Sequence, residues 1–306
     1  MTGIPAPSYR GLAPAKLNLF LHINGRIAEG KHQGYHELQT YFQLIHYGDW
    51  LHIETTQTPQ ITVQWQAGDE SILHQPSNAQ DDLIYRAATA LQQIAIEQGK
   101  LPLGAHILLQ KNTPVGGGMG GGSSAAATTL LALNRLWSLN LSRSELQDIA
   151  VLLGADVPVF IMQTSAWAEG IGERTMPMPS PQNAPYFVIV VPQSTQFTHQ
   201  LFAHPQLCRD TPKQEAQDTL SHWKTQAGNA FEPIALKESA AISDCFYALR
   251  AQAGFARLTG SGACVFAPVA SEAIGQRIAA HILNEIKAAR RVIVAKAFVP
   301  AERATN

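Results

Sequence analysis

The sequence predicts an α+β protein made of two lobes. Four strand-like segments open the chain, segments with helical periodicity follow them, and a proline-rich stretch from Met176 to Pro185 precedes a second set of strands and helices. This order of elements is typical of α+β proteins. With 306 residues, 45% of them hydrophobic, the chain can bury a substantial core. We expect the lobes to span residues 1–172 and 173–306.

The first lobe is expected to begin with strands. From Lys16 to Ile23, hydrophobic residues alternate with Lys16, Asn18, Phe20 and His22, which predicts a half-buried strand. Residues 1–15 are interpreted as a short mobile lead that lacks the apolar region of a signal peptide. Three further strands are predicted at residues 38–45, 49–54 and 61–65, and together the four suggest an antiparallel arrangement.

Helices and a further strand complete the first lobe. Helices are predicted at residues 82–98, 123–137 and 142–153, with a strand at 105–110 before the second of them. Ser142 and Glu145 have the spacing of a capping box, and Gly154 is the expected end of that helix. In the second lobe we expect strands at 186–191, 263–268 and 291–298, a helical region at 211–253 and a helix at 272–289.

Composition excludes several classes of function. Lys and Arg number 22 against 23 Asp and Glu, so the net charge of −1 predicts no general attraction to nucleic acid or anionic membranes. Cys208, Cys245 and Cys264 fit neither a disulfide framework nor a thiolate zinc site. Nowhere do roughly 18 apolar residues run together, as a membrane span requires. We expect a cytoplasmic protein with no nucleic acid, membrane or obligate protein partner.

The glycine-rich segment from Gly116 to Gly122 is the strongest local signal of function. Glycines leave backbone N–H groups accessible, and the N-terminus of the helix that follows adds donors and partial positive charge, so the segment predicts a phosphate site. A flexible surface loop is the alternative. The segment is not a Walker A loop, because Gly122 stands where that loop needs lysine. Gly116, Gly118 and Gly121 satisfy G-x-G-x-x-G, but the acidic residue of a dinucleotide site has no convincing counterpart.

Five segments carry a resemblance to a known family. The stretch from Pro114 to Ser124 resembles the ATP loop of the GHMP small-molecule kinases, and the segment from Leu258 to Val265 is similar to their third glycine motif. Residues 14–19, 34–38 and 154–158 (PAKLNL, GYHEL and GADVP) narrow the resemblance to members whose alcohol substrate carries a cytidine diphosphate.

The resemblance implies a fold, a reaction and two substrates. It implies a first lobe like ribosomal protein S5 domain 2, a ferredoxin-like second lobe, and transfer of the γ-phosphoryl group of ATP to a hydroxyl in isoprenoid precursor synthesis, with Mg²⁺ carried by the nucleotide. The accepting substrate would be a small cytidine diphosphate ester. The residues expected to bind ATP are Pro114, Val115, Gly116, Gly117, Gly118, Met119, Gly120, Gly121, Gly122, Ser123 and Ser124.

Two residues are expected to be catalytic. Asp156 matches the family's catalytic aspartate and would accept the hydroxyl proton; capping the turn at residues 157–160 is the alternative role. Lys16 would keep that carboxylate ionised and neutralise the phosphoryl oxygens. Asn18 lies two residues on, on the same strand face, and is expected to contact substrate. The accepting hydroxyl is expected between Lys16 and Asp156.

The base of the substrate is expected at three further residues. Tyr35 and His36 resemble the family's cytidine-recognising pair, and Phe202 matches a second aromatic residue. The connection from Gly25 to Gly34 is longer than usual in the family and carries Gln33 where aspartate is common.

Three alternative functions stay open at this point. Another GHMP kinase would phosphorylate a different alcohol, a non-catalytic module would bind nucleotide without turnover, and a nicotinamide dehydrogenase would bind a dinucleotide tightly.

Overall fold

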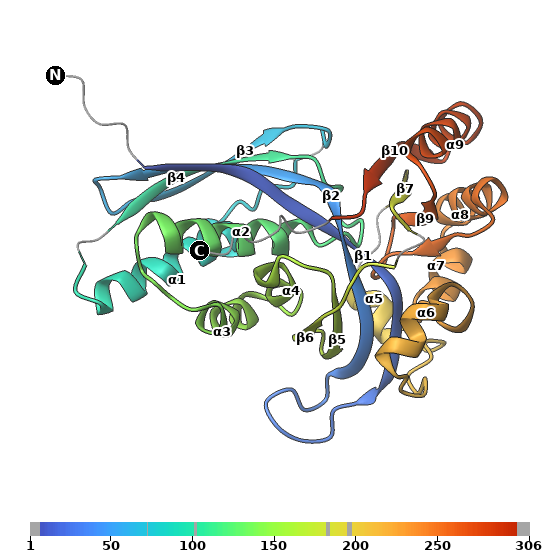
Figure 1. Cartoon of the computed structure of the whole chain (residues 1–306), viewed down its shortest axis with the longest axis horizontal. Helices are drawn as coiled ribbons and strands as arrows, with labels where there is room; N and C mark the ends of the chain where they lie inside the picture. Colours follow the sequence, from blue (N-terminus) through green and yellow to red (C-terminus); the bar gives the residue numbers. More distant parts are fainter. Residues whose placement is uncertain (1–6, 72, 101–102, 182–183, 195–197, 299–306) are drawn as a thin grey trace. The chain divides into compact units, whose positions relative to one another are not determined.

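The computed structural model describes residues 7–71, 73–100, 103–181, 184–194 and 198–298 (Figure 1). The chain forms two compact units. Unit 1 comprises residues 1–15, 47–115 and 120–162, and unit 2 comprises residues 16–46, 116–119 and 163–306. Strands β1 (Ser8–Arg26) and β2 (His36–Thr56) each contribute residues to both units. The units interleave along the chain, and the lobe boundary expected after residue 172 stays a prediction.

In unit 1, β4 (Gly104–Lys111) pairs with strands on both sides. It runs antiparallel to the second half of β2 and parallel to β3 (Ile61–Ala67), with Ile61 opposite Ala105. The expectation of an antiparallel start is therefore wrong for β3. The short helix η1 (Ala79–Asp81) and helix α1 (Leu83–Glu97) lie between β3 and β4 in sequence, and a connection of this length allows parallel pairing.

Helices pack together against this part of the sheet (Figure 1). Helix α1 contacts β3 and α2 (Gly121–Leu136), while α4 (Val157–Met162) contacts both α2 and α3 (Arg143–Leu153). The predicted capping box is confirmed: Ser142 Oγ accepts from the Glu145 N–H, and the Glu145 carboxylate accepts from the Ser142 N–H. Helix α3 ends at Gly154 as predicted, and α2 begins two residues earlier than expected.

Strand β2 is one strand, where the sequence predicted two with a break around Gly48. Gly48 is not a turn residue. A Cβ at this position would overlap the carbonyl oxygen of Ala13, so β1 passes too close for any side chain. Glycine in a strand often marks such an approach of another backbone rather than a bend. The predicted mobile lead is wrong over residues 8–15, which belong to β1; residues 1–6 lie outside the described residues.

Unit 2 contains an antiparallel sheet of four strands in the order β10–β7–β9–β8, formed by Ala289–Lys296, Tyr186–Pro192, Val265–Val269 and Arg257–Leu258. Helices α8 (Ala240–Ala253) and α9 (Glu272–Glu285) pack on it. In the same unit, β5 (Ala166–Gly170) and β6 (Arg174–Pro177), which the sequence analysis did not predict, extend the first half of β2.

The region expected to be helical at residues 211–253 is only partly so. Helices α6 (Ala216–Gln226), α7 (Glu232–Glu238) and α8 cover most of it, whereas residues 211–215 have no regular structure. A further short helix, α5 (Thr198–Ala203), comes before it.

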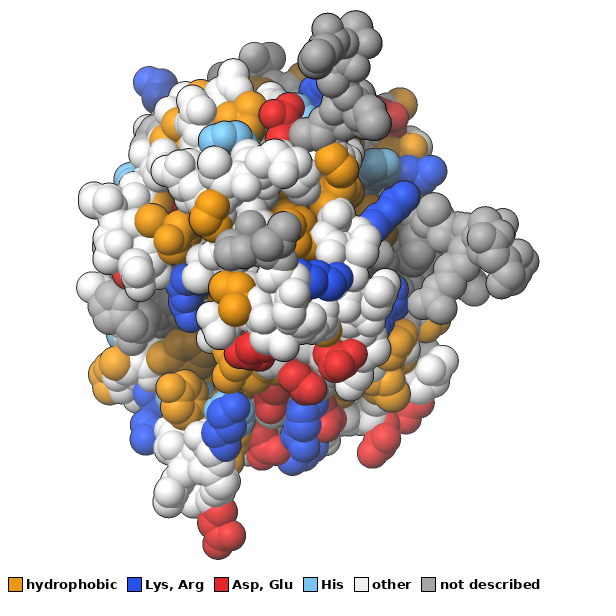
Figure 2. Space-filling view, turned by 90° about the vertical axis from the view of Figure 1, so that its left-hand side faces the viewer, with side chains coloured by type: hydrophobic (Ala, Val, Ile, Leu, Met, Phe, Trp, Pro, Cys, Tyr) orange, Lys and Arg blue, Asp and Glu red, His pale blue; other side chains and the backbone are white. Residues whose placement is uncertain are grey.

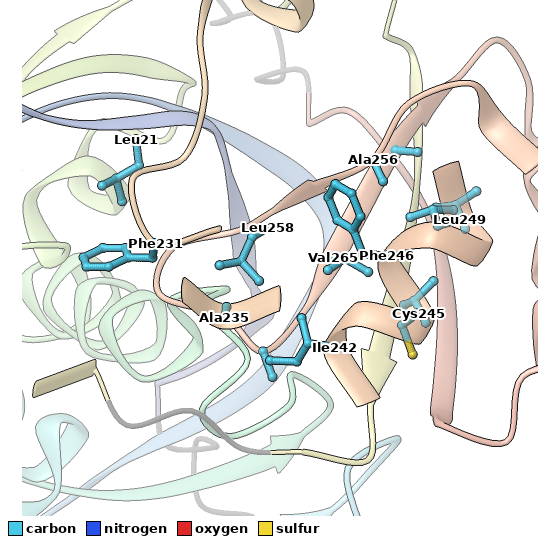
Figure 3. Packing of buried hydrophobic residues seen from close by; sticks show 14 of the residues in the cluster. Leu21, Phe231, Ala235, Ile242, Cys245, Phe246, Leu249, Ala256, Leu258 and Val265 are labelled. Carbon is cyan, nitrogen blue, oxygen red and sulfur yellow. The ribbon is translucent and has the colours of Figure 1, made fainter. Parts of the chain in front are cut away.

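An apolar cluster forms part of the core of unit 2 (Figure 3). Its side chains come from β1, the sheet, α7 and α8, and include Leu21, Phe231, Ile242, Phe246, Leu258 and Val265. Burying one such side chain contributes about 1.5–3 kcal/mol to stability. This cluster fixes the second half of β1, which carries several of the predicted site residues.

The second half of β1 is buried on both faces, so the predicted half-buried strand is wrong. Leu17, Leu19, Leu21 and Ile23 are buried as expected, and the opposite face is covered as well. Its buried polar side chains form hydrogen bonds, as buried polar groups generally do, and only His22 Nδ1 among the side-chain atoms of Lys16, Asn18 and His22 is buried without a partner. Among them, His22 Nε2 accepts from the Gly228 N–H (3.1 Å), and Gly228 O in turn accepts from the Leu21 N–H (2.9 Å).

Protonation of His22 is expected to destabilise the fold. Burial, with a contribution from the Arg257 cation, lowers the pKa of His22 from 6.5 to about 4. The unfolded chain therefore binds a proton that the folded chain does not, so His22 stabilises fully above pH 6.5 and its contribution is lost as the pH falls toward 4. Between pH 7 and pH 5 this residue alone should lower the free energy of unfolding by about 2 kcal/mol.

Urea unfolding of the unmodified protein and of His22→Gln at both pH values measures this. Glutamine keeps an acceptor for the Gly228 N–H but does not titrate, so the pH-dependent loss should be smaller by that amount in the variant. An equal pH-dependent loss in the free energy of unfolding of the two proteins would show that His22 is not its source.

The surface carries mixed charge. On the face drawn in Figure 2, Lys and Arg side chains lie among Asp and Glu, and hydrophobic side chains are dispersed between polar ones. This mixture agrees with the net charge of −1. Within the described part of the chain, no helix combines the length and apolar character that crossing a bilayer demands.

Candidate active site

The glycine loop joins β4 to α2. Gly116, Gly118 and Gly120 all have positive φ angles of 69–73°, a left-handed conformation that recurs at every second residue. Alternation of this kind turns successive N–H groups toward one side, as in backbone anion sites. Gly120 is the N-cap residue of α2 and has no side chain to accept from the first-turn amides. The loop therefore combines the two backbone features that bind phosphate.

The third glycine motif holds the first part of this loop. Within unit 2, the N–H groups of Ala263 and Cys264 donate to the carbonyl oxygens of Gly116 (3.0 Å) and Gly117 (3.3 Å). Thr259 Oγ1 donates to Gly118 O (3.2 Å). The segment around residues 258–264 thus supports the glycine loop.

A buried ion pair supports the second part of the loop in unit 1. The Asp49 carboxylate accepts from Lys111 Nζ (2.6 Å), from the backbone N–H groups of Asn112 and Thr113, and from Thr113 Oγ1. Lys111 Nζ also bonds Thr113 Oγ1. A Cβ on Gly121 would overlap that hydroxyl, so the start of α2 packs directly on this network. Asp49 and Lys111 were not predicted from the sequence.

Removing Lys111 is expected to leave an uncompensated buried charge. The Asp49 side chain is 0% exposed and that of Lys111 is 4% exposed, so in Lys111→Met the carboxylate loses its cation without access to water. The expected loss in the free energy of unfolding is about 3–5 kcal/mol. Lys213→Met is the matched control, because its partner Glu37 lies at 2.6 Å in an exposed pair, and surface pairs are worth about 0–1 kcal/mol. Denaturant titration measures the free energy of unfolding of both variants. Similar small losses in the two would contradict the expected cost of an unpaired buried carboxylate.

Lys16 and Asn18 lie on the same face of β1, as predicted. Lys16 Nζ donates to Asn18 Oδ1 (2.6 Å) and lies 5.3 Å from the centre of the Phe42 ring. Asn18 donates through Nδ2 to Thr40 Oγ1 (2.8 Å), and its backbone N–H donates to Thr259 Oγ1 (3.0 Å). The Lys16 N–H donates to Met119 O, so β1 is also tied to the glycine loop.

These contacts fix the Lys16 ammonium firmly. Only 3% of Lys16 and 1% of Asn18 are exposed, and Thr259 links both the strand and the glycine loop. An ammonium group held in this way needs no reorganisation to neutralise a developing negative charge.

Asp156 follows α3 and directly precedes α4, in unit 1. The Val157 N–H donates to Gly154 O (3.1 Å), which closes the turn that carries the aspartate. Lys16 belongs to unit 2, so the expected pairing of Lys16 with Asp156 stays a prediction. Asp156 also occupies the position of a cap residue, which leaves its structural role open beside the catalytic one.

Two of the three predicted base-binding residues lie together in unit 2. The rings of His36 and Phe202 are stacked, with centroids 5.1 Å apart and planes at 28°. Tyr35 is 61% exposed, and its ring meets His32 edge-on at 6.0 Å. The long connection is closed by hydrogen bonds from the Ile27 N–H to Tyr35 O and from the Gly34 N–H to Ile27 O, which hold Tyr35 and His36 at the start of β2.

Comparison with known proteins agrees with this geometry. Residues 82–164 match the GHMP kinases N terminal domain, and residues 209–287 match the GHMP kinases C terminal domain. A 4-diphosphocytidyl-2-C-methyl-D-erythritol kinase from Herminiimonas arsenicoxydans is 42% identical over 281 residues, covering 90% of this chain and 91% of the relative. The chain belongs to the 4-diphosphocytidyl-2-C-methyl-D-erythritol kinase family.

Further members of this family match along most of the chain. One from Shewanella piezotolerans is 44% identical and covers 83% of this chain and 82% of its own length. The crystal structure of a 4-(cytidine 5'-diphospho)-2C-methyl-D-erythritol kinase superposes with a TM-score of 0.75 at 28% identity, covering 94% of this chain and 98% of that one. The predicted GHMP kinase fold is confirmed, and the chain is an ATP-dependent kinase. This decides against the dinucleotide interpretation of the glycine motif.

Proposed function

We propose that this protein transfers the γ-phosphoryl group of ATP to the 2-hydroxyl of 4-diphosphocytidyl-2-C-methyl-D-erythritol, a step of the non-mevalonate isoprenoid pathway. The observation that carries the proposal is the 42% identity to a kinase named for this substrate over 90% of the chain. The stacked His36 and Phe202 rings support it, because a flat aromatic surface suits a nucleoside base.

The glycine loop supports the role of ATP. Phosphoryl transfer depends on positioning and on electrostatic stabilisation of charge at the transferring group. In this proposal the amides of Gly116 to Ser124 bind the triphosphate, and Mg²⁺ arrives as part of the nucleotide substrate. Among the described residues, no three or more His, Cys, Asp or Glu side chains form a group that could hold a metal ion.

Each catalytic residue has one task in this proposal. Lys16 neutralises charge on the phosphoryl oxygens, and its short contact to Asn18 supports a fixed ammonium position. Asp156 accepts the proton of the attacking hydroxyl. The hydroxyl oxygen attacks phosphorus, the bond from phosphorus to the bridging oxygen breaks, and ADP leaves without a phosphoenzyme. A cytoplasmic location stays a prediction.

Incubating the purified protein with ATP and a panel of alcohols tests the proposal. The panel contains 4-diphosphocytidyl-2-C-methyl-D-erythritol, homoserine and mevalonate, and phosphorus NMR identifies the product. We expect a new phosphate monoester only with the cytidine diphosphate substrate. Phosphorylation of homoserine or mevalonate, with the cytidine substrate unchanged, would refute the specificity; absence of any product would refute the activity.

A further inference from the structure

Arg209 makes an unusual set of contacts in the irregular segment between α5 and α6. Its Nε donates to His36 Nε2 (3.2 Å), and its Nη1 donates to Leu207 O (3.1 Å). Its Nη2 donates to two carbonyl oxygens at the end of α5, those of Phe202 (3.0 Å) and His204 (2.8 Å). One guanidinium group therefore connects His36 on β2 to the backbone that carries Phe202.

The geometry of a guanidinium group makes this connection rigid. Its donors lie in one plane in a fixed fork. The carbonyl oxygens bound by Nη1 and Nη2 therefore determine the direction in which the Nε–H points. The last carbonyls of a helix lack partners within the helix, and arginine is a favourable donor to them. Phe202 has a second aromatic contact, because its ring meets Phe231 edge-on with centroids 4.8 Å apart. The His36 ring is thus located relative to a Phe202 ring that is already anchored in the core.

The same contact determines where His36 carries its proton. An arginine Nε–H can only donate, so His36 Nε2 must accept, and a neutral ring then holds its proton on Nδ1. Partial burial and the cations of Arg26 and Arg209 lower the pKa of His36 from its usual 6.5, which favours the neutral ring. Removing Arg209 therefore removes the donor that selects the Nδ1–H form of His36.

We propose that Arg209 is the positioning residue of the nucleoside-base subsite, which holds His36 in its Nδ1–H form and stacked on Phe202. The identity of the base rests on the proposed function, whereas the control of His36 does not. Arg209 acts through His36 and Phe202, not by transferring a group itself.

The first experiment needs no substrate. Long-range ¹H–¹⁵N NMR of the histidine side chains distinguishes Nδ1–H from Nε2–H, and a His36→Gln variant identifies the His36 signals among the 11 histidines. We expect the Nδ1–H form in the unmodified protein. In Arg209→Met we expect loss of that preference and a rise in the pKa of His36, because a nearby cation is removed. Retention of the Nδ1–H form and of the pKa in Arg209→Met would overturn the proposal.

The second experiment measures substrate binding. Arg209→Met should raise KM for the cytidine diphosphate substrate tenfold or more and leave KM for ATP and kcat within threefold. Arg209→Lys keeps the charge but not the fork, so it should keep the His36 pKa low and still raise that KM; it also serves where Arg209→Met does not fold. Lys213→Met is the matched control from the same segment and should change neither property.

The two experiments separate the possible failures. If KM for both substrates rises together and the NMR signature of His36 is unchanged, Arg209 has a general structural role and the proposal is wrong. If His36 responds as expected but the protein does not phosphorylate the cytidine substrate, the proposed function fails while the control of His36 by Arg209 stands.

Discussion

Asp156→Asn is expected to lower kcat by about 10²- to 10⁴-fold, the usual contribution of a positioned general base. Asparagine has nearly the same shape, but its amide oxygen does not take up the hydroxyl proton at neutral pH. Asparagine and aspartate are about equally good at the N-terminal cap of a helix, so the alternative structural role at the start of α4 would be preserved. The substitution therefore separates catalysis from capping.

Steady-state kinetics and thermal unfolding on the same preparations make this measurement. We expect KM for both substrates to change little and the unfolding temperature to stay the same. Asp148→Asn, an exposed position on α3, is the matched control and should retain full activity. Undiminished turnover of Asp156→Asn would remove the proposed base, and a large drop in unfolding temperature would favour the structural role.

Gly118→Ala is expected to be the most damaging single change in the glycine loop. Gly118 has a φ of 73°, a left-handed conformation that costs an L-residue about 1–2 kcal/mol. An added Cβ would also overlap the carbonyl oxygen of Thr259, which is backbone and has little freedom to move. The loop must then shift away from the segment that supports it. We expect a loss of at least about 2 kcal/mol in the free energy of unfolding and at least a tenfold rise in KM for ATP.

Gly122→Ala is the matched control for this stability change. A Cβ there would have Leu83 Cδ1 as its contact, at an ordinary 3.8 Å, and the residue lies inside α2. Alanine in a helix is favoured over glycine by up to about 1 kcal/mol, so the free energy of unfolding should stay the same or rise. Urea titration compares the two variants. Equal losses would show that the loop responds to any added side chain, and not to the particular approach of Thr259.

Local signals predicted the helices and the glycine loop well. Hydrophobic periodicity and caps identified α1 and α3, because a helix is stabilised by residues three or four positions apart. The glycine loop was equally visible, since its backbone chemistry depends on consecutive residues. The resemblance to GHMP kinases added Phe202, which its own surroundings in the sequence would not have distinguished from a core residue.

Contacts between distant residues account for what the sequence did not predict. Asn18 and Thr259 are 241 residues apart, and Lys111 and Asp49 are 62 apart, so no local pattern joins them. Gly48 was interpreted as a break because the approach of Ala13 is invisible in a single sequence. The strand at residues 16–23 was expected to be buried on one face only, because the hydrogen-bond partners of its polar face come from elsewhere in the chain.

The interleaving of the two units limits how this protein can be divided or recombined. The chain changes unit after residues 15, 46, 115, 119 and 162. Leu21 exchanges backbone hydrogen bonds with Gly228 and Ala230, so a fragment that ends near residue 172 takes Leu21 away from the residues that complete its pairing. Chimeras between relatives therefore require several coordinated junctions, and a single crossover would combine segments that have not been selected to fit each other.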